Sequence, residues 1–252
     1  MGNGVLTIGW FADIFKSMLD MIYPEKMNCI FCRAPLQRYN DYQLCGLCMS
    51  LLPFLSGDTC SKCGKPLDRG SSHGICSDCA DIDVYFDGAA SVFEYAGIIQ
   101  SAIYRLKYDG DRDIASVLGK FMARELDQRN WRPDVIIPVP LHLDRLNERG
   151  FNQSELLAAT IGRESGIDVA TGVLTRKKYT ESQVSLTRLE RRQNVRGVFE
   201  ADGSRTIKDK SVLVVDDIMT TGATLNECSR ALKGLDPASI YCLSAATPSY
   251  VK

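Results

Sequence analysis

The chain has 252 residues, of which 45% are hydrophobic and 24% are charged, a balance typical of a folded globular protein. This length accommodates one domain of ordinary size and a small additional module. The formal net charge of −1 excludes a uniformly basic nucleic-acid-binding protein but leaves room for a local basic patch. Every long apolar stretch is interrupted by charged residues, so the sequence predicts no membrane span.

The N-terminal segment 1–23 mixes apolar and charged positions. Its large apolar side chains recur in steps of three or four residues, as on one face of a helix: Ile8, Phe11, Phe15, Met18 and Ile22. The segment lacks a basic leader and a cleavage site, so we do not expect a secretion signal. We expect an amphipathic helix that packs on its own protein, with docking to a membrane surface or a partner as the alternative.

Residues 24–82 are rich in cysteine. Eight of the ten cysteines form C-x-x-C pairs, which are Cys29/Cys32, Cys45/Cys48, Cys60/Cys63 and Cys76/Cys79. Four thiolates satisfy tetrahedral zinc, so the pairs predict a double zinc ribbon with two structural zinc ions. Sequential pairing keeps each loop short, and the spacing also allows an interleaved arrangement. A disulfide framework is the competing interpretation, but the missing secretion signal disfavours it, and we expect a cytoplasmic protein.

From residue 83 onward, strand-like and helix-like segments alternate. We expect strands at 88–95, 134–139, 168–174, 211–216 and 239–246, and helices at 98–108, 111–127, 152–165 and 223–234. This alternation predicts an α/β domain over 83–252, in which helices cover both faces of a mainly parallel sheet.

The loop after strand 134–139 begins with Val139, Pro140 and Leu141. It lies at the carboxyl edge of the predicted sheet, where open α/β folds bind ligands. Downstream side chains with donors for an anion at that edge are Arg145, Arg149 and Asn152. A solvated helix face, paired with neighbouring acids, is the alternative for the two arginines. Lys107 has the same two interpretations, and we expect His142 to be an ordinary loop histidine rather than a proton-transfer group.

The segment 176–196 is strongly basic. It holds seven Lys or Arg residues against two Glu, a local net charge of 7 − 2 = +5. A basic segment near an anionic ligand predicts a mobile lid that closes over the ligand. A solvated loop and a nucleic-acid contact are the alternatives.

Residues 211–225, SVLVVDDIMTTGATL, contain the most informative motif of the chain. An apolar strand ends in two acids, Asp216 and Asp217. The loop that follows offers N–H groups and hydroxyls at a helix N-terminus and consists of Thr220, Thr221, Gly222, Ala223 and Thr224. The segment matches neither a Walker A loop nor a dinucleotide-binding glycine pattern. We therefore predict a phosphate site with two acids beside it.

This motif resembles the phosphoribosyl-pyrophosphate (PRPP) motif of type I phosphoribosyltransferases. The resemblance implies that Asp216 and Asp217 are catalytic and bind the ribose hydroxyls, and that the TTGAT turn holds the 5-phosphate. It also implies that the loop at 139–141 grips the pyrophosphate and that magnesium accompanies PRPP.

Three further segments extend the resemblance to the ComF family: YRLKYDG (104–110), DVIIPVPLHLDRLNERGFNQSELLA (134–158) and TESQVSLTRLERRQNVRGVF (180–199). The family implies a type I phosphoribosyltransferase fold behind an N-terminal zinc ribbon. It implies phosphoribosyl transfer to an acceptor that the sequence does not identify, and a link to natural competence, single-stranded DNA and DNA-uptake proteins. The alternative function is a non-catalytic accessory protein that binds DNA or partner proteins and uses the fold for sensing.

Overall fold

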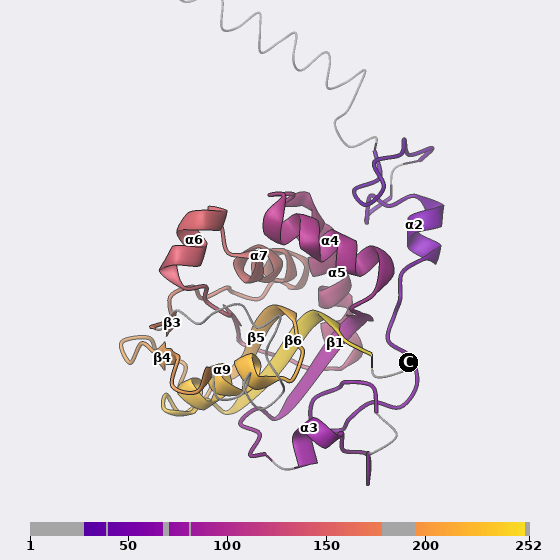
Figure 1. Cartoon of the computed structure of the whole chain (residues 1–252). Coiled ribbons are helices and arrows are strands. Elements are labelled where there is room, and N and C mark those ends of the chain that lie inside the picture. The colour runs from indigo at the N-terminus through magenta and orange to yellow at the C-terminus, as the bar shows by residue number, and fades with distance from the viewer. Residues whose placement is uncertain (1–27, 39, 68–70, 81, 178–194, 250–252) are drawn as a thin grey trace, which may run out of the picture. The chain divides into compact units, whose positions relative to one another are not determined.

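The computed structural model describes residues 28–38, 40–67, 71–80, 82–177 and 195–249 (Figure 1). Two predicted features, the helix at 1–23 and the part of the basic segment at 178–194, lie outside the described residues. Contacts divide the chain into two compact units, and the boundary falls between Leu51 and Leu52. Among the described helices, none has the length and apolar character needed to cross a bilayer.

The first unit is a small cysteine-rich ribbon. Asn28 and Pro35 form an antiparallel bridge, and Cys29 N donates a 2.8 Å hydrogen bond to Ala34 O inside the turn between them. Helix α2 (Gly46–Ser50) follows, and its N-cap is Cys45, whose sulfur accepts from the backbone N–H of Cys48. These short turns place thiols together without a large apolar core.

The second unit contains a parallel four-stranded sheet in the order β1-β6-β5-β2. The strands are β1 (Gly88–Glu94), β2 (Val135–Pro138), β5 (Ser211–Ile218) and β6 (Ser239–Thr247). β5 pairs with β6 and with β2, and its residues from Val212 to Asp217 are buried, as the apolar run predicts for a central strand. The predicted parallel sheet is therefore confirmed.

The expected strand at 168–174 is mostly absent from the sheet. Only Val169 bridges β2, opposite Ile136. Gly172 then adopts φ +76°, a left-handed conformation that ends the extended run. The chain continues as β3 (Leu174–Arg176), which pairs antiparallel with β4 (Phe199–Ala201) in a separate two-stranded sheet.

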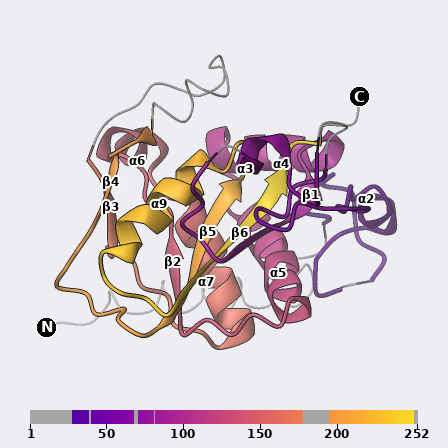
Figure 2. The same cartoon turned by 90° about the horizontal axis from the view of Figure 1, so that it is seen from below.

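Helices cover both faces of the sheet (Figures 1 and 2). One face carries α4 (Gly97–Tyr108), α5 (Asp113–Gln128) and α7 (Gln153–Ser165), and the other carries α9 (Ala223–Lys233). Alternate residues of β5 serve the two faces, so that Val212 and Val214 join the α9 side of the core. The short helix α6 (Leu143–Arg149) follows β2; it was not among the expected elements, although a helix face was the alternative for Arg145 and Arg149.

The described residues 52–67 and 71–80 of the cysteine-rich region belong to the sheet unit, and α3 (Ser77–Ala80) lies among them. They cover the free edge of β1, where Leu55 N donates to Val92 O (3.1 Å) and Ala89 N donates to Lys62 O (3.2 Å). Gly64 has φ +68°, and a Cβ there would lie 2.3 Å from Ala89 O. Only glycine therefore allows this close approach.

Candidate functional site

A cavity of about 550 Å³ opens at the carboxyl ends of β2 and β5. Predicted site residues that line it are Lys107, Val139, Pro140, Leu141, Arg145, Arg149, Asp216, Asp217, Thr220, Gly222, Ala223 and Thr224. Thr221 and Asn152 are predicted residues outside this lining. The Thr221 side chain is buried, and its hydroxyl accepts from Ala223 N at 3.4 Å. The fold thus gathers both predicted loops and the two acids around one space.

The two acids occupy the end of β5 and are almost completely buried. Asp216 Oδ1 accepts hydrogen bonds from Ser154 Oγ (3.0 Å) and from Asp217 N (2.9 Å). Asp217 Oδ1 accepts from Ile218 N (2.9 Å), and Asp217 Oδ2 lies 2.6 Å from Lys107 Nζ. Lys107, in the last turn of α4, thus supplies a counter-charge inside the cavity.

Burial and the neighbouring Asp217 carboxylate raise the pKa of Asp216 to about 7, against the effect of Lys107 and the hydrogen-bond donors. Burial alone would lower the pKa of Lys107, but Asp217 and Asp216 raise it above its ordinary value. Lys107 therefore stays charged, while Asp216 changes its protonation state near neutral pH.

The loop between β5 and α9 has the geometry of an anion site. Gly222 is the N-cap of α9 and adopts φ +77°, which favours glycine. Ala223 N donates to the Thr221 hydroxyl, whereas Gly222, which has no side chain, caps none of the N–H groups that follow Ala223 in the first turn. These groups, with the Thr220 and Thr224 side chains at the cavity wall, suit a phosphate.

The loop after β2 begins beside the acids, since Val139 N donates to Val215 O (2.9 Å), and its residues 139–141 line the cavity. α6 brings Arg145 and Arg149 to the same cavity. Arg145 also pairs with Glu148 (3.0 Å), and Arg149 donates to Gln153. Arg145 therefore has both the ion pair expected on a helix face and a position at the cavity wall.

Two predicted polar residues near this loop act as helix caps. Asn152, which the sequence offered as one donor for the anion, caps α7: its Oδ1 accepts from Ser154 N (3.0 Å) and its Nδ2 donates to Val139 O (3.0 Å). His142 caps α6, where its Nδ1 accepts from Asp144 N at 3.3 Å, although its ring also borders the cavity.

The cavity also contains residues that the sequence motifs did not single out as site residues. One of them is Ser154, which contacts Asp216. Arg176, the first residue of the basic segment predicted as a lid, also reaches the wall, from the end of β3. Tyr104 and Tyr108 stand one helical turn apart on α4, with ring centroids 4.8 Å apart. The available signal in the sequence was the spacing of two tyrosines four residues apart beside Lys107, and the structure shows both to be exposed.

The eight paired cysteines form two clusters, Cys29, Cys32, Cys45 and Cys48 in one and Cys60, Cys63, Cys76 and Cys79 in the other. Within each cluster the sulfurs lie within 4.8 Å of one another. Zn–S bonds of about 2.3 Å require S···S separations of about 3.8 Å in a tetrahedron. Cys32 and Cys45 are 3.6 Å apart, and Cys63 and Cys76 are 3.5 Å apart. Both clusters therefore fit structural zinc, in the sequential pairing.

Two family models match the chain. The double zinc ribbon domain matches residues 18–80, and the phosphoribosyl transferase domain matches residues 111–249, more than half of the chain. Together with the parallel sheet, these matches confirm the predicted order of a zinc ribbon followed by a phosphoribosyltransferase domain.

Similar proteins match almost over their full length. The chain is 31% identical to Competence protein F of Haemophilus influenzae, across 87% of this chain and 97% of that protein. It is 30% identical to DNA utilization protein YhgH of Escherichia coli O157:H7, across 85% and 95%, respectively. It is 28% identical to Competence protein ComFC of Bacillus subtilis, across 82% and 89%. The chain belongs to the ComF (competence protein F) family, in which a double zinc ribbon precedes a phosphoribosyltransferase domain.

Proposed function

We propose that the protein binds PRPP and transfers its phosphoribosyl group to an acceptor, with release of pyrophosphate. The observation that carries this proposal is the single cavity shared by the acid pair, the phosphate loop and the loop after β2. This arrangement offers separate positions for the three parts of PRPP, namely the ribose, the 5-phosphate and the pyrophosphate.

Each part of the cavity has a distinct role in this proposal. Asp216 and Asp217 accept hydrogen bonds from the ribose hydroxyls, and the turn at 220–224 donates N–H groups to the 5-phosphate. Backbone groups at 139–141 and the guanidinium groups of Arg145 and Arg149 hold the pyrophosphate. When bound with PRPP, magnesium neutralises charge on the pyrophosphate.

In the transfer step, the bond between ribose C1 and the pyrophosphate oxygen breaks, and its electron pair leaves with pyrophosphate. A lone pair of the acceptor forms the new bond to C1, and the acceptor loses a proton to solvent. The sugar ring carries positive charge in between, as in other glycosyl transfers. The buried carboxylates of Asp216 and Asp217 stabilise that charge because they are fixed in place before reaction.

Pyrophosphate release tests this function. The protein, magnesium and PRPP are incubated with free nucleobases or single-stranded DNA, and pyrophosphate is followed over time. We expect release that depends on one acceptor and that disappears in the Asp216→Asn/Asp217→Asn variant. PRPP binding without acceptor-dependent release would contradict catalysis and favour the sensing alternative. We place this chemistry in the cytoplasm, since zinc thiolates persist in a reducing compartment.

A second candidate function is binding of single-stranded DNA at the mouth of the same cavity. Tyr104 and Tyr108 have exposed fractions of 56% and 60%, and the Arg149 guanidinium lies 5.7 Å from the Tyr108 ring centroid. Exposed aromatic rings beside cations are typical of surfaces on which bases stack. Relatives named Competence protein F and DNA utilization protein YhgH support this candidate. In this second function, DNA-uptake proteins are the proposed protein partners.

Fluorescence anisotropy with a labelled oligothymidine tests the second candidate. Tyr104→Ala/Tyr108→Ala should weaken binding at least about tenfold, since each stacked base contributes about 1–3 kcal/mol. Tyr104→Phe/Tyr108→Phe should retain binding because the rings remain. Tyr85→Ala removes an exposed tyrosine outside the cavity lining and is the matched control. Equal affinity in all variants would exclude this surface.

A further inference from the structure

The second cysteine cluster shares a core with the helix behind the phosphate loop. All four of its cysteines are buried in one apolar cluster with Leu225, Cys228 and Leu232 of α9. The first cysteine cluster belongs to the other compact unit. The second zinc site is therefore part of the unit that builds the cavity.

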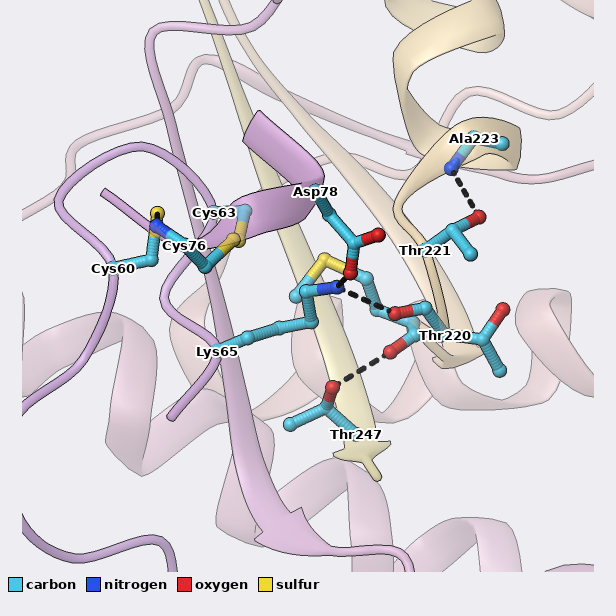
Figure 3. Close-up of polar contacts among 10 residues, drawn as sticks. Cys60, Cys63, Lys65, Cys76, Asp78, Thr220, Thr221, Ala223 and Thr247 are labelled. Atoms are coloured by element: carbon cyan, nitrogen blue, oxygen red, sulfur yellow. Dashed lines mark hydrogen bonds and ion pairs between the residues drawn. The ribbon is translucent and has the colours of Figure 1, made fainter. Parts of the chain in front are cut away.

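Lys65 connects this cluster to the phosphate loop (Figure 3). It follows Cys63 by two residues, and its side chain is fully buried. Its ammonium group pairs with Asp78, which lies between Cys76 and Cys79, and donates a 2.9 Å hydrogen bond to Thr220 O. One lysine thus joins both cysteine knuckles to a loop 155 residues away in sequence.

A buried lysine has a large desolvation cost, which the Asp78 carboxylate offsets by supplying the opposite charge. The ion pair alone would complete a structural link within the ribbon. The additional bond to Thr220 O is not needed for that link, and it directs the ammonium group at the loop that lines the cavity. The contact therefore indicates a role in positioning the loop.

The bond also sets the direction of the loop's N–H groups. The described chain has no cis peptide bond, so the C=O and N–H of each peptide group point in opposite directions. Lys65 holds the Thr220 carbonyl, and the Thr247 hydroxyl holds the Met219 carbonyl at 2.7 Å. The N–H groups of the same two peptides, on Thr221 and Thr220, are therefore directed away from these holders.

We propose that Lys65 is a positioning residue for the phosphate loop, through which zinc at the second cysteine cluster and a phosphate ligand in the cavity strengthen each other's binding. This proposal rests on the proposed PRPP site. Since coupling between two sites is reciprocal, the same factor must appear in both binding equilibria.

The first test uses calorimetry with ribose 5-phosphate, which contacts the phosphate loop without the pyrophosphate. Lys65→Met keeps the aliphatic stem but removes the ammonium group, and it should weaken binding by about 5- to 50-fold at unchanged zinc content. Lys65→Arg keeps a cationic donor and should restore most of the affinity. Lys62→Met is the matched control, because Lys62 Nζ donates to Cys79 O (3.4 Å) within the same ribbon. It should change binding less than about twofold.

The second test measures zinc release from the wild-type full chain to a chromogenic chelator. Saturating ribose 5-phosphate should slow release of one zinc ion and leave the other unchanged, which keeps the proposal testable even where Lys65→Met does not fold. If wild type binds ribose 5-phosphate, but Lys65→Met does not change the affinity and the ligand does not slow zinc release, the coupling is overturned and the proposed function is not. Absence of ribose 5-phosphate and PRPP binding to wild type would overturn the proposed function, and the coupling with it.

Discussion

Ser154 Oγ donates a 3.0 Å hydrogen bond to Asp216 Oδ1, and so the first turn of α7 holds the first acid of β5. The backbone N–H of Asp217 donates to the same oxygen. These donors favour the carboxylate, whereas burial and the Asp217 charge favour the neutral acid and raise its pKa to about 7. Small changes around Asp216 should therefore alter binding at neutral pH.

Removal of the serine hydroxyl tests this relationship. Ser154→Ala should weaken PRPP affinity at pH 7 by about tenfold, since a hydrogen bond to a charged group contributes about 1.5–3 kcal/mol. The pH midpoint of binding should also move upward. The control is Ser229→Ala, another buried serine, whose hydroxyl donates to Leu225 O (2.8 Å) within α9. If the two variants bind PRPP equally, Ser154 has no special role.

The raised pKa of Asp216 also predicts how stability depends on pH. The folded protein keeps a proton on Asp216 between about pH 4 and 7 that the unfolded chain releases, so the ligand-free protein loses stability as pH rises through this window. The stabilisation by this proton is fully present below about pH 4. Above pH 7 it is lost, which lowers the free energy of unfolding by up to about 4 kcal/mol.

Urea unfolding of wild type and Asp216→Asn at several pH values measures this contribution, because other groups cancel in the difference. The variant should be about 2–4 kcal/mol more stable than wild type at pH 8, and the advantage should decline toward pH 4. A difference that is constant across this range would show that Asp216 titrates normally.

The two zinc sites should differ in what they stabilise. Purified wild type should contain two zinc ions per chain, and Cys32→Ser and Cys63→Ser should each contain about one. Because Cys63 is buried in the core of the sheet unit, Cys63→Ser should lower the free energy of unfolding of that unit by at least about 3 kcal/mol. Cys32→Ser should change it by less than about 0.5 kcal/mol. If both variants lowered the free energy of unfolding of the sheet unit equally, the assignment of the two zinc sites to different units would be contradicted.

Local sequence patterns predicted those features that depend on neighbouring residues. The apolar run 212–215 predicted a central strand, and each of its positions is buried between two helical layers. The cysteine spacing predicted two metal clusters because a C-x-x-C turn brings its thiols together locally. The expected end of the zinc ribbon module near residue 82 remains a prediction. The contacts in the structure divide the chain at a different point, between Leu51 and Leu52.

Features that depend on long-range contacts were not predictable in this way. Lys65 and Thr220 are far apart in sequence, and no pattern around either residue indicates the other. The helix α6 is only seven residues long and buries no side chain, so it has no apolar periodicity to detect. The Ser154 contact follows from the packing of α7 against β5, which the sequence of α7 alone does not reveal.

Calorimetric titration of PRPP with magnesium tests the central claim most directly. Wild type should bind PRPP, and Asp216→Asn/Asp217→Asn should weaken binding at least about 100-fold, since two charge-assisted contacts to the ribose are lost. Thermal unfolding of the variant verifies that its sheet unit remains folded. Equal affinity of a folded variant and wild type, or no PRPP binding to wild type, would contradict the assignment of this cavity.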